Sequence, residues 1–184
     1  MAIVFSEIEK EFKETFGYVR QDIAAIRGKG LGLNCTVALL ICCACEMLAW
    51  HKDMKGHEVF ALLLPDEKSY QMIAKKMFDA LRNGLAHSFR PQTIRIGGDE
   101  WRFSLAWQTG PHLSVIRGTP NWLRLNVKVF SERITDQINA YEVELRNSLP
   151  ARRNFQLKAG KCVTEVPPNA KSLIVAWKSV LAGQ

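Results

Sequence analysis

Long apolar runs are scarce in this sequence, and their scarcity argues against membrane insertion. The longest run, residues 37–45, ends at Glu46 and falls far short of the ~20 residues that a membrane-spanning helix needs. The apolar start of the chain has no basic leader and runs directly into an acidic stretch, so no signal peptide is expected. We therefore expect a cytoplasmic protein that has no contact with a membrane.

Cysteine and histidine are also few, and their spacing does not predict a metal site. The cysteines are Cys35, Cys42, Cys43, Cys45 and Cys162. An odd number, with four members in one apolar stretch, does not form a disulfide framework and favours a reducing compartment. Cys42 and Cys45 have the spacing of a metal or redox pair, but no second pair accompanies them, so we interpret both as buried apolar residues. His51 and His57 flank a loop without a recognised ligand spacing, and we expect neither a metal nor a cofactor.

Apolar residues are abundant, and positive charge is abundant in one half of the chain. Hydrophobic residues make up 47% of the sequence and charged residues 23%, which suits one folded domain over residues 1–184. The net charge of +7 comes entirely from residues 88–184, which hold fourteen basic and seven acidic residues. Such a one-sided field favours polyanions such as RNA. The alternative is a basic half that is merely well solvated.

The periodicity of apolar residues predicts a helical bundle. The expected helices cover residues 5–27, 34–52, 66–86, 131–149 and 168–182. The second helix is apolar all round, which places it at the centre of the bundle. We expect Asn34 to cap this helix, Asp66 to begin the third, and Ser131 to cap the fourth, which Pro150 ends. Residues 1–90 and 131–149 then form the bundle core.

Between residues 92 and 130 the period changes from that of a helix to that of a strand. Apolar and polar residues alternate in 101–107 and again in 123–129, and residues 112–117 are a further candidate strand. Gly97-Gly98 predicts a hairpin turn. We expect a small antiparallel β-meander inserted into the bundle, and therefore an α+β fold that is mainly α.

One segment carries residues suited to chemistry. Arg82 is followed by Asn83 and, five positions after the arginine, by His87, behind an apolar helix that contains Glu46. This pattern resembles the R-x4-6-H signature of HEPN domains, whose best-known members are ribonucleases, many of them toxins or defence effectors. The resemblance covers residues 5–90, with the helix at 131–149 as a candidate further part, and the β region departs from it. It implies an antiparallel helical bundle, a homodimer, RNA as substrate and an antitoxin or other protein as partner.

The residue types fit metal-independent RNA cleavage. The 2′-hydroxyl of RNA can attack the adjacent phosphate, so neither a metal nor a covalent enzyme group is required. Imidazoles titrate near neutral pH, and His87 would act as general base or acid. Arg82 would bind the phosphate as negative charge builds up on it. Asn83 would orient His87 or bind a phosphate oxygen. The hypothesis is an endoribonuclease of toxin or defence type.

Helix geometry leaves alternatives open. Positions 82 and 87 lie about 140° apart on a straight helix, so either a bend at Gly84 or a pairing of two protomers must bring them together. Arg82 can instead pair with Asp79 or Glu46, while His87 caps the helix end. The chain would then be a non-catalytic module that binds a nucleotide, a nucleic acid or a protein, or a scaffold that binds no nucleic acid.

The expected sheet has a basic face. Arg95, Arg102, Arg124 and Lys128 fall on the polar side of the predicted strands. They could follow a phosphate backbone, with tryptophans stacking on bases, or they could form a solvated surface. Trp101 and Trp107 are in phase with the apolar face and are better assigned to the core than to base stacking.

Overall fold

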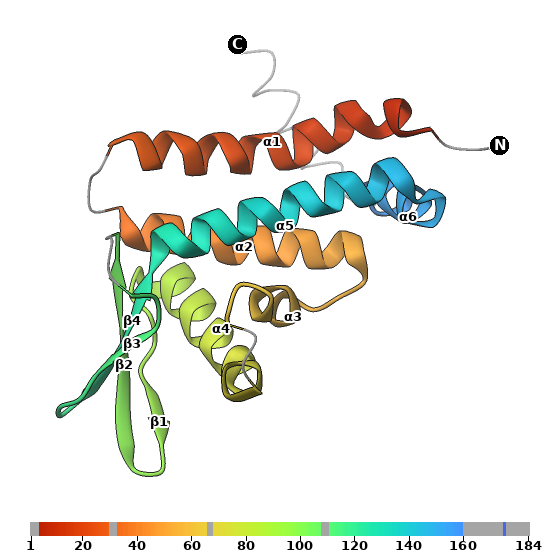
Figure 1. Cartoon of the computed structure of the whole chain (residues 1–184). Helices are drawn as coiled ribbons and strands as arrows, with labels where there is room; N and C mark the ends of the chain where they lie inside the picture. Colours follow the sequence, from red (N-terminus) through yellow and green to blue (C-terminus); the bar gives the residue numbers. More distant parts are fainter. Residues whose placement is uncertain (1–3, 30–32, 66–67, 108–110, 160–174, 176–184) are drawn as a thin grey trace.

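The computed structural model describes residues 4–29, 33–65, 68–107, 111–159 and residue 175, and it has a mainly helical α+β fold. The described helices are α1 (Phe5–Lys29), α2 (Asn34–Lys52), α3 (Gly56–Ala61), α4 (Lys68–Ser88), α5 (Val127–Asn147) and α6 (Leu149–Ala159). The strands are β1 (Ile94–Ile96), β2 (Asp99–Ala106), β3 (Ser114–Ile116) and β4 (Asn121–Asn126). Figure 1 shows the helices stacked on α2, with the sheet projecting at one end beside α4.

Helix α2 is the centre of the bundle, as its all-apolar sequence predicts. It contacts α1, α3, α4, α5 and α6, and Val37, Ile41, Cys45 and Leu48 along its length are almost fully buried. By length and composition alone, this helix could also cross a membrane. The sequence did not suggest this, because its longest uninterrupted apolar run, residues 37–45, is shorter than the helix. About half of it is buried against the other helices, as in the core helix of a folded bundle.

An aromatic cluster joins α2 to the helices on either side of it. Phe12 and Phe16 of α1, Tyr141 of α5 and Phe155 of α6 are fully buried around His51. The rings of His51 and Phe155 stack with their centroids 4.6 Å apart. These large rings bury much of the apolar surface that holds the bundle together.

Helix α5 has the apolar stripe expected of it, but it begins earlier than predicted. Its predicted inward residues, Ile134, Ile138, Tyr141 and Leu145, are all buried. The cap, however, is Asn126, whose side-chain oxygen accepts hydrogen bonds from the backbone N–H groups that open the helix. Residues 127–129 therefore belong to α5 and not to a strand, although they continue the strand-like alternation. Ser131 is not the cap, since its hydroxyl donates to the Lys128 carbonyl.

Other predicted helix boundaries also need correction. Asn34 does not cap α2; its side-chain amide donates to the Leu105 carbonyl at 3.0 Å and so ties α2 to β2. Pro150 does not terminate the helical region, because it sits in the first turn of α6, where the missing N–H has no helical partner to lose. The short helix α3 was not expected. Asp66 and the helix expected at 168–182 lie outside the described residues, apart from residue 175.

The sheet is mixed, so the prediction of an antiparallel meander is wrong. Its strand order is β1-β2-β4-β3. The predicted hairpin between β1 and β2 is confirmed, with Gly97 and Gly98 both at positive φ, where glycine is favoured. Strand β4, however, pairs with β2 in parallel, from Trp101 opposite Asn121 to Ala106 opposite Asn126. The chain between β2 and β4 is long enough to return across the sheet, and β3 forms within that crossover.

Candidate functional site

Arg82 is held in a fixed orientation at the junction of α4 and α2. Its Nε donates to Oε1 of Glu46 at 3.0 Å, and its Nη1 donates to Oδ1 of Asn83, also at 3.0 Å. The side chains of Arg82 and Glu46 are 42% and 44% exposed. Two contacts therefore fix the guanidinium plane while its remaining N–H groups stay open to solvent, as a phosphate-binding arginine requires.

The pairing of Arg82 with Glu46 is one of the alternatives that the sequence left open, and it is present. The other candidate partner, Asp79, instead pairs with Lys75 at 2.8 Å. A half-exposed ion pair contributes little to stability, on the order of 0–1 kcal/mol. The Arg82–Glu46 pair is therefore weak enough to rearrange when a phosphate arrives.

His87 lies in the last turn of α4 and is exposed. Within the described part of the chain, its imidazole makes no hydrogen bond or ion pair. The ring is thus accessible to a substrate and is not engaged by its neighbours.

Of the two alternatives for bringing Arg82 and His87 together, an interruption of the helix at Gly84 is not observed, because α4 continues to Ser88. Gly84 has another role: residues 90–92 pack directly on it. A Cβ at this position would lie 2.3 Å from the Arg90 carbonyl oxygen and 2.4 Å from the Gln92 nitrogen. The Gln92 N–H donates to the Ala80 carbonyl at 2.9 Å and holds this segment against the helix.

Because α4 is regular, Arg82 and His87 do not face each other within one protomer. Five residues of α-helix separate them by about 140° in direction and about 7.5 Å along the axis. Asn83 stands between them, since it bonds to Arg82 and shares a helix face with His87, four residues on. One protomer therefore directs the arginine and the imidazole towards widely separated faces near the end of α4.

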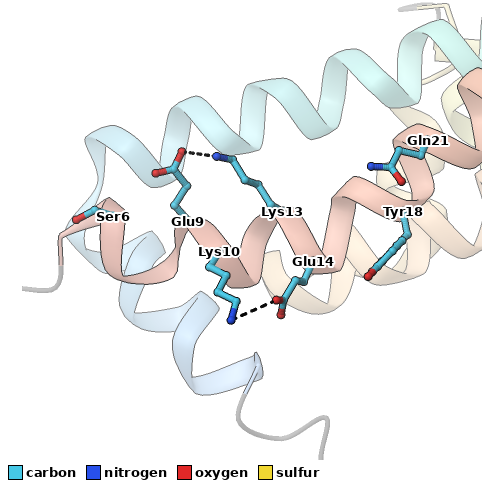
Figure 2. A pocket seen from close by; sticks show the side chains of 7 residues that line it. All are labelled: Ser6, Glu9, Lys10, Lys13, Glu14, Tyr18 and Gln21. Carbon is cyan, nitrogen blue, oxygen red and sulfur yellow. Dashed lines mark ion pairs between the residues drawn. The ribbon is translucent and has the colours of Figure 1, made fainter.

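Neither Arg82 nor His87 lines either of the two surface hollows described next. A groove of about 600 Å³ separates α4 from the sheet and is mainly apolar, with Ile73, Trp101 and Phe103 in its lining. A shallower depression of about 460 Å³ follows the outer face of α1. Figure 2 shows its described lining, all from α1, with charges that pair along the helix, as in the Glu9–Lys13 and Lys10–Glu14 ion pairs. Such neutralised pairs offer no net charge to a ligand.

The described residues provide no metal centre. No group of three His, Cys, Asp or Glu side chains within the described ranges could hold an ion. His51 is in the aromatic cluster, and its burial lowers its pKa to about 4. Burial raises the pKa of Cys42 to about 12 and that of Cys45 well above its ordinary value, so both thiols stay protonated.

A second imidazole, half-buried, was not singled out from the sequence. His112 packs edge-on against Phe130, and its Nδ1 accepts a hydrogen bond from the Asn126 N–H at 3.3 Å. Its burial, with a smaller contribution from Arg133, lowers its pKa to about 4. It therefore supports the junction of β4 and α5 as a neutral acceptor.

The basic face predicted for the sheet is present, with one exception. Alternation along the paired strands places Arg95, Arg102 and Arg124 on one face, which we call the outer face. Lys128 is not part of it, because it lies in the first turn of α5. The opposite, inner face carries Trp101 and Phe103 and lines the groove beside α4.

No model of a known protein family, no curated protein and no solved structure matches this chain. The described residues themselves therefore carry the functional proposal.

Proposed function

We propose that this protein is an endoribonuclease of HEPN type that needs no metal. It acts as a homodimer in which Arg82 of one protomer and His87 of the other bind the same phosphate. The observation that carries the proposal is the arginine oriented by Glu46 and Asn83, together with an exposed imidazole five residues later on the same helix. The net charge of +7 favours a polyanionic substrate.

The geometry of α4 supports the proposed dimer. A regular helix directs Arg82 and His87 about 140° apart, so one phosphate cannot readily reach both within a protomer. A twofold axis near the end of α4 would place each arginine opposite the partner's imidazole and create two equivalent sites.

In each site His87 takes the proton of the 2′-hydroxyl, whose oxygen attacks the adjacent phosphorus. The bond to the 5′-oxygen breaks, that oxygen takes a proton from water as it leaves, and His87 returns its own proton to the solvent. The products are a 2′,3′-cyclic phosphate and a 5′-hydroxyl. Arg82 stabilises the charge that builds on the phosphate oxygens, and Asn83 keeps the guanidinium in place.

The test is cleavage of end-labelled RNA in excess EDTA. Wild-type protein should release cyclic-phosphate ends, whereas Arg82→Ala and His87→Ala should lose activity by at least about a hundredfold and stay folded. His57→Ala, at a histidine of α3, is the matched control and should cleave normally. Undiminished cleavage by either site variant would remove that residue from the mechanism.

Mixing the two inactive variants tests the shared site. If each site combines residues of two protomers, a mixed dimer of Arg82→Ala and His87→Ala has one intact site. Random exchange should then restore about a quarter of wild-type activity. A site contained within one protomer would give no restoration.

The Arg82–Glu46 ion pair also favours a second candidate, a non-catalytic dimer that binds a nucleotide, a nucleic acid or a protein. In that case the pair fixes α4 to α2 and His87 has no chemical role. Salt-sensitive RNA binding without cleavage would identify this function.

A cleaving dimer of this type would fit a toxin or defence role in the cytoplasm, with an antitoxin protein as its partner. The resemblance to HEPN domains is the support for this role. Growth arrest on expression of the wild-type chain, but not of His87→Ala, would be the expected result.

A further inference from the structure

The outer face of the sheet combines basic side chains with one tryptophan. Strand pairing sets Arg95 of β1, Arg102 and Ser104 of β2, Trp122 and Arg124 of β4, and Ser114 of β3 on this face. Trp122 lies opposite Arg102 across the parallel pair. Trp122 therefore lies on an inner strand of the sheet, between Arg102 of β2 and Ile116 of β3.

The charge of this face is positive. Its one carboxylate, Glu100, binds Arg102 through Nε at 2.8 Å and Nη2 at 2.7 Å. Arg95 and Arg124 have no ion-pair partner within the described part of the chain. Arg124 lies two residues beyond Trp122 on β4, and Arg95 lies on β1, beyond β2. Guanidinium groups on this face complement the phosphates of a nucleic acid.

The ring of Trp122 is supported and remains partly exposed. The guanidinium carbon of Arg102 lies 5.9 Å from the ring centroid, and Glu100 holds that guanidinium in position. Trp101 differs, since it faces the apolar groove on the inner side. Trp122 is half-buried, and a partly exposed ring with a guanidinium group against it is a common platform for a nucleobase.

We propose that the outer face binds single-stranded RNA, with one base stacked on Trp122 and the neighbouring phosphates contacted by Arg95 and Arg124. The choice of RNA as ligand rests on the proposed function, and the inference adds the surface on which that substrate is bound. Single strands are favoured because the faces of paired bases in a duplex are already stacked and cannot reach the ring.

The experiment measures binding of a fluorescent oligouridylate to the His87→Ala protein, which leaves the RNA intact. In that background Trp122→Ala should weaken binding at least about fivefold, and Trp122→Phe should restore most of it. The matched control is Trp50→Ala. Trp50 is also half-exposed with a cation over its ring, but it lies on α2, and its replacement should leave affinity unchanged.

A second variant tests the charges without altering the core. Arg124→Gln should weaken binding at all salt concentrations and lower the salt-dependence slope by about one. Arg153→Gln, at an exposed arginine of α6, should change neither quantity. Circular dichroism confirms that each variant is folded before its affinity is compared.

The outcomes separate this inference from the proposed function. Wild-type cleavage together with unchanged binding by Trp122→Ala and Arg124→Gln would overturn the inference and leave the nuclease intact. If the protein does not cleave RNA but its RNA binding depends on Trp122, the proposed nuclease function would be overturned and the proposed RNA-binding surface would stand. Equal affinity for duplex and single-stranded RNA would also overturn the inference.

Discussion

Replacing Gly84 with alanine should destabilise this protein, although the same change in an ordinary helix is stabilising. Alanine is favoured over glycine inside a helix by about 1 kcal/mol. At Gly84, however, the added methyl group would meet backbone and not a movable side chain: the Arg90 carbonyl oxygen at 2.3 Å, the Gln92 nitrogen at 2.4 Å and the Pro91 carbonyl carbon at 2.8 Å.

The expected size follows from what must move. Residues 90–92 would have to retreat by about 1 Å to reach ordinary van der Waals distance. The hydrogen bonds from Gln92 N–H to Ala80 O and from Arg90 N–H to Gly84 O would then be lost, at about 1 kcal/mol each. Overpacking costs a further 1–3 kcal/mol or so. After the helix gain is subtracted, the net loss should be about 2–4 kcal/mol.

Gly17 of α1 supplies the matched control. No described atom beyond its own helix lies within 4 Å of a Cβ at that position. Gly17→Ala should therefore raise the free energy of unfolding by about 1 kcal/mol. In a chain of this size, thermal unfolding should show roughly a 5–15 °C fall for Gly84→Ala and a small rise for Gly17→Ala.

Equal or greater stability of Gly84→Ala would refute this reasoning. It would mean that residues 90–92 do not rest on α4 and that Gly84 merely weakens the helix, as its sequence context suggests. Urea denaturation with an unchanged slope for both variants would confirm that the difference lies in the folded state.

Asn126→Ala should lower the free energy of unfolding in urea by about 1 kcal/mol, because the helix cap of α5 is lost. Burial lowers the pKa of His51 to about 4, so the unfolded chain binds a proton that the folded chain does not. Between about pH 6.5 and pH 4, His51 should lower stability by about 1.4 kcal/mol for each unit that the pH falls, and His112, whose pKa is also lowered to about 4, should add a similar slope; the total slope should be smaller in His51→Gln, as denaturation at several pH values would show. A thiol reagent at neutral pH should label Cys43 before Cys42 or Cys45, because Cys43 is exposed and the other two are buried and protonated; peptide mass mapping reports the order.

The sequence predicts those parts of the fold that depend on periodicity. The buried stripe of α5 and the central place of α2 follow from the spacing of apolar residues, because burial repeats with the helix turn. Helix α3 is only six residues long and shows too little of that repeat to be recognised. Helix α6 was missed because Pro150 stops a helix in its interior but is tolerated in its first turn.

The direction of the strands and the end of the sheet could not be read from alternation. Apolar and polar residues alternate identically in parallel and antiparallel pairs, so β2 and β4 gave no sign of their common direction. The same alternation continues through Val127 and Val129, which belong to α5 because the Asn126 side chain satisfies its first N–H groups. Because this alternation continues past the end of β4, the sequence wrongly predicts that Lys128 lies on the basic face of the sheet.

The sequence singles out the residues of the candidate site but does not give their geometry. Arg82, Asn83 and His87 are adjacent in sequence on one helix, and the pairing of Arg82 with Glu46 was one of two partners considered. That Gly84 leaves the helix straight depends on residues 90–92 packing against it, a tertiary contact that local propensity does not contain.

The passage from β4 into α5 takes place at a single residue, with no linker between them. Asn126 is the last residue of the strand and the cap of the helix, while the Asn34 side chain fastens β2 to the start of α2. A hinge needs a few residues that are free to change their backbone angles, and this junction supplies none. Amide hydrogens of β4 and of the first turns of α5 should therefore exchange together as one cooperative unit, and RNA bound on the sheet would be held rigidly with respect to the helices.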